Sequence, residues 1–249
     1  GSYIGPFLEG YKGTVEEGDM IMLSDPYSVG GAVSHCNDWL VLLPVFKDGR
    51  LIAYTSMFGH QSDIGGKVPG SMPIDATSIF QEGVRIPPIK IFKGGVYNED
   101  LIKLIMHQTR TPDWCKADLN ALIASCRVAA RRVVEMAERF GDDEFVSACE
   151  ELLARNSRAM QKLIDTAISE EKVSFEDYIC DDGMGFGPYK IKCTMWRENG
   201  RVVLDFDGTD PQSVASINFF LNENMMRMFF GIYMIMVFDP QILFNDGYY

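Results

Sequence analysis

The feature that most constrains this fold is an Asp-Gly pair at residues 48 and 49, between two apolar runs. The runs are DWLVLLPVF at 38–46 and LIAYTSMF at 51–58. Asp-Gly is a strong signal for the tight turn that joins two antiparallel strands, because both residues accept positive φ angles at low cost. The sequence therefore predicts a long β-hairpin with its closed end at this turn.

The open end of the hairpin brings together two segments that are far apart in the sequence. Counting back from the turn places Asn37 opposite His60 and Asp38 opposite Gly59. The segments SHCND and GHQSD then lie side by side. The register decides which face each side chain occupies, because a slip by one residue turns every side chain to the other face.

Four side chains at this open end carry chemistry, namely His35, Asp38, His60 and Asp63. Two imidazoles and two carboxylates in one neighbourhood suit a divalent transition metal such as manganese or zinc. Several glycines follow them and would let the backbone adopt positive φ angles. The pattern is compatible with a metal site, but structural or surface histidines explain it as well, and spacing alone does not decide between them.

A serine hydrolase is a rival interpretation of the same stretch. Ser34, Ser62 or Ser71 would act as the nucleophile, but the chain has no G-x-S-x-G motif to support it. The segment GHQSDIGGK also lacks the glycine spacing and the following Ser or Thr of a phosphate loop. We therefore expect no nucleotide site on this chain.

The chain changes character twice, which predicts a mixed α+β fold in three regions. Residues 1–97 are rich in glycine, proline and short apolar runs, and form a β-rich region with the metal hairpin. Residues 98–170 show helical periodicity, with a long amphipathic helix that ends at Gly141. Residues 171–249 contain a second hairpin at 187–206, turned at an Asn-Gly pair, and then an apolar helical stretch. We expect the three regions to form one continuous domain of a longer polypeptide.

Two further polar residues of the helical region have structural interpretations. His107 falls within an amphipathic helical pattern, where a histidine is more often structural than catalytic. Arg110 lies beside a proline turn at a helix exit, where it either holds an anion or caps the helix.

Composition and charge exclude several classes of protein. The formal net charge of −12 argues against nucleic acid as a partner, because phosphate contacts need clustered Lys and Arg. The longest apolar run, residues 225–238, is too short to span a membrane. Six scattered cysteines without a CxxC pair, and no visible signal peptide, predict free thiols in the cytoplasm.

Five ordered motifs resemble the hydantoinase B/5-oxoprolinase family. They are GDMIMLSDPY, SHCNDWLVLLPVF, HQSDIGGKVPGSMP, IFQEGVRIPPIKIF and TRTPDWCKADLNA. The resemblance runs from about residue 18 to at least residue 140, and continues more weakly through VVLDFDGTDPQ. Members of this family include the metal-bearing subunits of acetone and acetophenone carboxylases. They are longer at both ends, which implies that this chain is a segment of a larger subunit.

The resemblance also implies a ligand set and partners. It assigns the metal to His35, Asp38 and His60, and leaves Asp63 either to orient a ligand imidazole or to act as a fourth ligand. It implies an actin-like ATPase partner of the hydantoinase A type that binds ATP and phosphorylates the substrate. A small third subunit is left open.

The substrate class rests on a departure from the family pattern. Many members carry two adjacent histidines before the x-D-I-G-G element, where this chain has His60-Gln61. This favours a catalytic subunit of an ATP-dependent ketone carboxylase, which would join an activated enolate to bicarbonate-derived CO2. The alternatives are a subunit of an ATP-dependent cyclic amide hydrolase of the N-methylhydantoinase or 5-oxoprolinase kind, and a non-catalytic scaffold.

Overall fold

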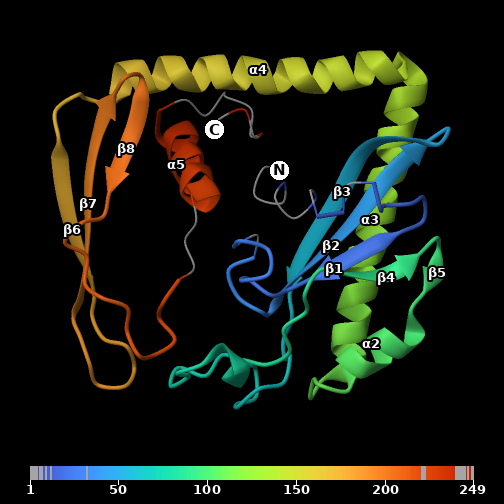
Figure 1. The fold of residues 1–249 in the computed structure, drawn as a ribbon, viewed down its shortest axis with the longest axis horizontal. Helices are drawn as coiled ribbons and strands as arrows, with labels where there is room; N and C mark the ends of the chain where they lie inside the picture. Colours follow the sequence, from blue (N-terminus) through green and yellow to red (C-terminus); the bar gives the residue numbers. More distant parts are fainter. Residues whose placement is uncertain are drawn as a thin grey trace. The chain divides into compact units, whose positions relative to one another are not determined.

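The computed structural model has a mixed α+β fold, as the sequence predicted, with two antiparallel sheets and long helices (Figure 1). It describes residues 5, 8, 10, 11, 13–31, 33–219, 223–238, 245 and 247. Two compact units are present. The N-terminal unit comprises residues 2–73 and 78–148, and the C-terminal unit comprises residues 74–77 and 149–249. The three regions predicted from the sequence meet after residues 97 and 170, where the secondary structure changes. The two compact units are instead defined by which residues pack together.

The N-terminal unit contains a five-stranded antiparallel sheet in the order β3-β2-β1-β4-β5. Its strands are β1 (Met20–Leu23), β2 (Asp38–Lys47), β3 (Arg50–His60), β4 (Ile89–Lys93) and β5 (Val96–Tyr97). The predicted hairpin is β2–β3, and its turn residues Asp48 and Gly49 have φ angles of 50° and 77°. These two positive φ angles are those of the tight turn that an Asp-Gly pair favours.

Among the described residues, two helices and one short 3-10 turn accompany this sheet, namely η1 (Ile79–Gln81), α2 (Glu99–Met106) and α3 (Pro112–Phe140). The next helix, α4 (Asp142–Ala167), begins in this unit and continues into the C-terminal unit after residue 148. The Asn98 side chain caps α2 by accepting a hydrogen bond from the Leu101 N–H at 3.1 Å. Gly141, at φ 95°, ends α3 as predicted, and α4 begins at the next residue.

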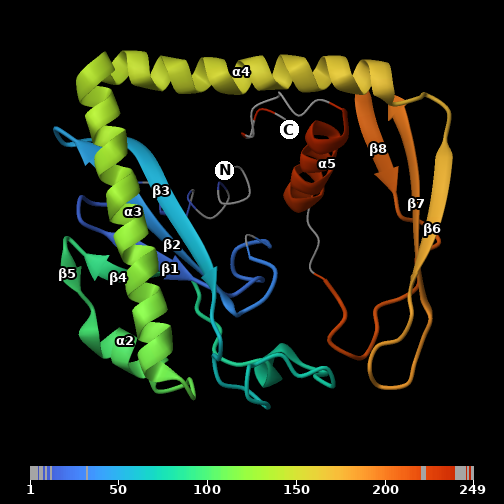
Figure 2. The ribbon, with the colours of Figure 1, turned by 180° about the vertical axis from the view of Figure 1, so that it is seen from behind.

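The two faces of the sheet pack differently. Figure 2 shows α3 running across one face of the sheet. The odd-numbered Trp39 and Val41 of β2 are fully buried in one cluster with Leu119 of α3. The even-numbered Leu40 and Leu42 join a separate cluster with residues of β1. Even-numbered residues of β2 therefore lie on the face away from α3.

The register of β2 and β3 corrects the sequence prediction by one residue. Asp38, and not Asn37, is paired with His60. A bulge near the turn places Ile52 as an extra residue in β3, and it shifts the pairing from there to the open end. A count from the turn alone could not include this residue.

Packing against α3 is consistent with the shift. In the bulged register Trp39 is paired with Gly59, so both face α3. A Cβ at Gly59 would lie only 3.2 Å from Leu122. In the unbulged register Phe58 would be paired with Trp39, and its ring would have to displace the Leu122 side chain.

Besides most of α4, the described part of the C-terminal unit contains a three-stranded antiparallel sheet and one apolar helix. Its elements are β6 (Val173–Ile179), β7 (Tyr189–Glu198), β8 (Arg201–Asp205) and α5 (Glu223–Phe238). The predicted second hairpin is β7–β8, and Asn199 and Gly200 have positive φ angles. Sequence analysis missed β6, because VSFEDYI is exposed along nearly its whole length and shows no apolar run. Within the described ranges, no helix combines the length and apolar character needed to cross a bilayer.

Candidate metal centre

Strand pairing positions the three predicted ligands. Asp38 is the first residue of β2, His60 is the last residue of β3, and the two are directly paired. Directly paired residues of antiparallel strands project from the same face, which here is the face away from α3. His35 precedes β2 in a tight turn, in which its carbonyl accepts the Asp38 N–H at 3.2 Å.

The structure brings the donor atoms of all three side chains together. His35 Nε2 lies 3.0 Å from His60 Nδ1 and 3.4 Å from Asp38 Oδ1. His60 Nδ1 lies 3.2 Å from Asp38 Oδ1. His35 and Asp38 are partly buried, and His60 is exposed. The cluster is therefore anchored on the protein side and open to solvent at His60.

This donor set fits a divalent transition metal. Ligand atoms about 2.1 Å from a metal are about 3.0 Å apart at octahedral angles and about 3.4 Å apart at tetrahedral angles. The observed separations of 3.0, 3.2 and 3.4 Å lie within that interval. Two imidazoles and one carboxylate are ligands that manganese and zinc accept. Three protein ligands would leave coordination positions open, which is typical of a catalytic site.

Ser34 contacts the ring nitrogen of His35 that faces away from the cluster. Its Oγ lies 2.8 Å from His35 Nδ1. When Nδ1 donates its proton to this oxygen, the Nε2 lone pair faces Asp38 and His60, which is the tautomer that a metal ligand needs. Of the other two serines considered as nucleophiles, Ser62 pairs with Thr111 and Ser71 donates to the Gly65 carbonyl.

Asn37 holds the two ligand-bearing segments together. Its side chain is buried, and Nδ2 donates to the Gln61 carbonyl at 3.1 Å and, at the longer distance of 3.5 Å, to the Gly70 carbonyl. The Gln61 N–H donates in turn to the Asn37 carbonyl at 2.8 Å. A residue between His35 and Asp38 is thus bonded to the residue after His60. Sequence analysis missed Asn37, because its contacts depend on the bulged register.

The Asp63 carboxylate is directed into the glycine loop, defined here as residues 64–71. Oδ1 accepts hydrogen bonds from the N–H groups of Gly65 and Arg110, at 2.9 and 3.0 Å. Oδ2 accepts the Gly70 N–H and the Arg110 guanidinium, both at 2.9 Å. Burial by itself would raise the pKa of Asp63, but these hydrogen bonds outweigh burial and lower the pKa well below its usual range. A role of Asp63 at the metal stays a prediction.

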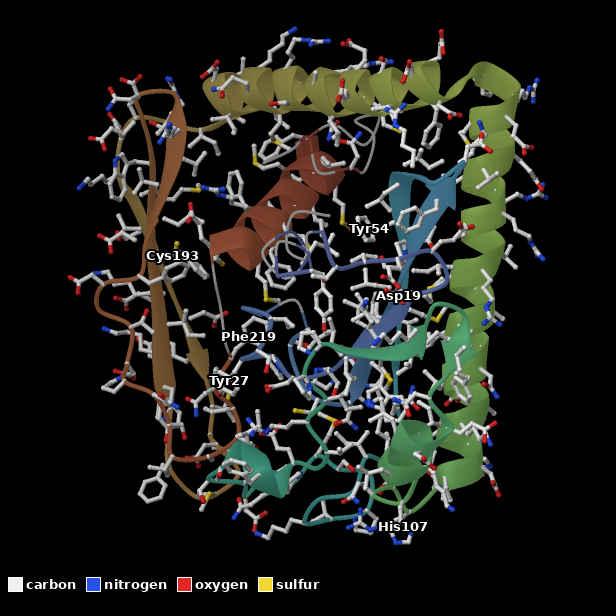
Figure 3. All side chains as sticks on the ribbon, turned by 45° about the vertical axis from the view of Figure 1, so that its right-hand side comes forward. Asp19, Tyr27, Tyr54, His107, Cys193 and Phe219 are labelled. Carbon is white, nitrogen blue, oxygen red and sulfur yellow. The ribbon has the colours of Figure 1, made fainter. Side chains whose placement is uncertain are left out.

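The two polar residues from the helical region lie near the end of α2. Arg110 binds an anion, and that anion is the Asp63 carboxylate of the same chain. His107 is exposed and occupies the C-cap position just after α2, rather than a position inside the helix (Figure 3). It is not among the residues whose donor atoms converge with His35 and His60.

Comparison with known proteins places the chain in a family. The family model for hydantoinase B/oxoprolinase matches residues 2–249. The chain belongs to the hydantoinase B/oxoprolinase family. The resemblance that five short motifs indicated therefore extends over nearly all of the sequence.

Individual relatives in the family carry names of two enzyme types. The chain is 31% identical to the caprolactamase β subunit of Pseudomonas jessenii over 94% of its own length and 39% of that subunit. It is 27% identical to the acetophenone carboxylase δ subunit of Aromatoleum aromaticum, over 85% of the chain and 31% of that subunit. The crystal structure of ATP-dependent caprolactamase from Pseudomonas jessenii matches with a TM-score of 0.87 and 28% identity. That match covers 100% of this chain and 42% of the other. The chain thus spans about two fifths of the length of the caprolactamase β subunit that it matches.

Proposed function

We propose that His35, Asp38 and His60 hold a divalent metal, manganese or zinc, in the catalytic subunit of an ATP-dependent enzyme. The observation that carries this proposal is the convergence of two imidazole nitrogens and one carboxylate oxygen within 3.4 Å of one another. A divalent ion at this point supplies a Lewis acid for a carbonyl or carboxyl oxygen. Asp38 offsets positive charge, and Ser34 orients His35 through Nδ1.

We propose a cyclic amide as the first substrate class. The support comes from the caprolactamase of Pseudomonas jessenii, which matches in sequence at 31% identity and in structure at a TM-score of 0.87. In such a reaction the ligand cluster would face the amide carbonyl from its open side at His60. A partner subunit of the hydantoinase A type would bind ATP, in keeping with a sequence that contains no phosphate loop.

A ketone carboxylase is the second candidate. It is favoured by the His60-Gln61 pair, which replaces the two adjacent histidines of many family members, and by the 27% identity to the acetophenone carboxylase δ subunit. In that reaction the same cluster would offset the charge of an enolate oxygen or of bicarbonate. The chemistry demanded of His35, Asp38 and His60 is the same in both cases.

Metal analysis of the intact protein tests the site. We expect stoichiometric manganese or zinc in the wild type, loss of the metal in His60→Ala, and retention in His107→Ala. The last variant is the matched control, because His107 is an exposed histidine outside the cluster. A wild-type protein without metal, together with full activity of His60→Ala, would leave the scaffold interpretation standing.

Substrate-dependent ATP consumption separates the two enzyme types. The intact complex is supplied with ATP and either caprolactam or 5-oxoproline, and in parallel with acetone or acetophenone plus bicarbonate. We expect ATP consumption with the cyclic amide and without bicarbonate. Consumption that requires both a ketone and bicarbonate would identify the carboxylase instead.

A further inference from the structure

Arg110 joins the glycine loop to the end of α2 through several bonds at once. Its Nη1 donates to Asp63 Oδ2 at 2.9 Å, to the Val68 carbonyl at 3.0 Å and to the Gly65 carbonyl at 3.2 Å. Its Nη2 donates to the Gly66 carbonyl at 2.6 Å. One guanidinium therefore binds a carboxylate and three backbone carbonyls, a set of acceptors that suits a planar donor with fixed geometry.

The backbone of Asp63 is anchored at the same place. The Thr109 hydroxyl donates to the Asp63 carbonyl at 2.6 Å, and the Cys115 thiol donates to it at 3.2 Å. Thr109 and Cys115 are both buried. The segment just after His60 is thus fixed to the start of α3 by side chains that lie about 50 residues further along the chain.

The same network reaches the other ligand-bearing segment. Gly70 donates its N–H to Asp63 Oδ2 and accepts the weak contact from Asn37 Nδ2 through its carbonyl. Asn37 also donates to the Gln61 carbonyl. A continuous path of hydrogen bonds therefore leads from Arg110 through Asp63 and Gly70 to Asn37, which lies between His35 and Asp38.

We propose that Arg110 is a positioning residue for the metal centre, and that it acts through Asp63 and the glycine loop. The inference rests on the proposed metal site and adds a residue that does not touch it. Its physical basis is that only two residues separate His60 from Asp63. Hydrogen bonds fix both the backbone carbonyl and the side-chain carboxylate of Asp63. Metal affinity depends on holding ligand atoms within a few tenths of an ångström. Greater mobility of residues 60–63 would therefore weaken metal binding.

Metal affinity of the intact protein tests the role of Arg110. The ion is Mn2+, measured by electron paramagnetic resonance and by calorimetry on metal-depleted protein. For Arg110→Met we expect affinity to fall about tenfold, the effect typical of residues that support metal ligands. The matched control is Arg132→Met, because Arg132 is an exposed arginine that pairs with Glu135 on α3.

Arg110→Lys separates positioning from stability. A lysine keeps a positive charge beside Asp63, but its single ammonium cannot bind all four acceptors in one plane. We expect this variant to fold, with Mn2+ affinity between those of the wild type and Arg110→Met and with a broadened resonance from the bound ion. Wild-type affinity and spectrum in a folded Arg110→Lys protein would overturn the inference. If the wild type itself fails to bind Mn2+ or Zn2+, the proposed metal site fails first, and it fails whatever Arg110 does.

Discussion

At the scale of single residues, the Asp63 carboxylate shows how a buried charge is stabilised in this chain. It is 3% exposed, and it is compensated by three backbone N–H groups and one guanidinium. Because its pKa is lowered in the folded protein, the ionised carboxylate stabilises the fold above the usual pKa of an aspartate, about 3.9. This stability is lost as the pH falls below that value.

Asp63→Asn tests this contribution. The amide cannot carry the charge, and its NH2 group faces N–H donors, so we expect a loss of about 3 kcal/mol in the free energy of unfolding near pH 7. The wild type should lose stability from about pH 5 downward, whereas the variant lacks this titration. The difference between the two proteins should therefore narrow between about pH 5 and pH 2 in urea unfolding measurements.

The control for this experiment is Asp48→Asn, which changes an exposed aspartate in the β2–β3 turn. Its stability should follow that of the wild type over the same pH range. If the difference in the free energy of unfolding between wild type and Asp63→Asn stays constant with pH, the loss comes from shape and not from charge.

At the scale of elements, the β2–β3 turn decides the hairpin through backbone conformation alone. Gly49 has a φ angle of 77°, and a Cβ there would meet nothing within 4 Å. Gly49→Ala should therefore cost about 1 kcal/mol, from backbone strain without any clash. Chemical unfolding measures this loss, and Asp48→Asn should be close to neutral, because Asn also accepts a positive φ angle. If Gly49→Ala has the same free energy of unfolding as the wild type, another turn conformation serves equally well.

The glycine loop offers a comparison between strain and clash. Gly65 and Gly70 have similar φ angles of 87° and 85°. A Cβ at Gly65 would overlap the Gln108 carbonyl oxygen, whereas a Cβ at Gly70 would enter open space. We expect Gly65→Ala to cost about 2 kcal/mol more than Gly70→Ala in thermal unfolding. Equal costs would show that the loop can move away from Gln108.

The elements also show where reading the sequence succeeds. Turn chemistry located both hairpins, because Asp-Gly and Asn-Gly act on their own backbone and need no distant partner. Helical periodicity and Gly141 located α3 and the start of α4. The exposed β6 was not found, because its strand conformation depends on pairing with β7 and not on an apolar pattern of its own.

At the scale of the whole molecule, metal binding should raise the stability of the folded protein. A ligand that binds only the folded state stabilises it by mass action, by about 2.7 kcal/mol at a hundred times its dissociation constant. We therefore expect chelation to lower the melting temperature of the wild type and of His107→Ala. The same treatment should leave His60→Ala unchanged, and calorimetric scans with and without chelator give the comparison. Equal shifts in all three proteins would place the stabilising ion elsewhere.

Family membership was also predictable from the sequence, because five short motifs in a fixed order carry more information than any one of them. The substrate class was not. Caprolactamase and acetophenone carboxylase relatives match the same chain. Under the proposed function, either chemistry would use an oxygen polarised at the same two imidazoles and one carboxylate. Residues that select the substrate are not identified by the ligand cluster.

The sequence by itself determined the hairpin and the neighbourhood of its open end, where it placed four side chains, and the family resemblance singled out the three that meet there. Only the tertiary structure decided that Asp38 is paired with His60 on one face, because the bulge at Ile52 shifts the register and sets Gly59 against Leu122 of α3. It also decided that Asp63 binds Arg110 and the glycine loop. A turn is specified by local backbone energetics, whereas a bulge and a buried ion pair depend on residues that meet only after the chain has packed.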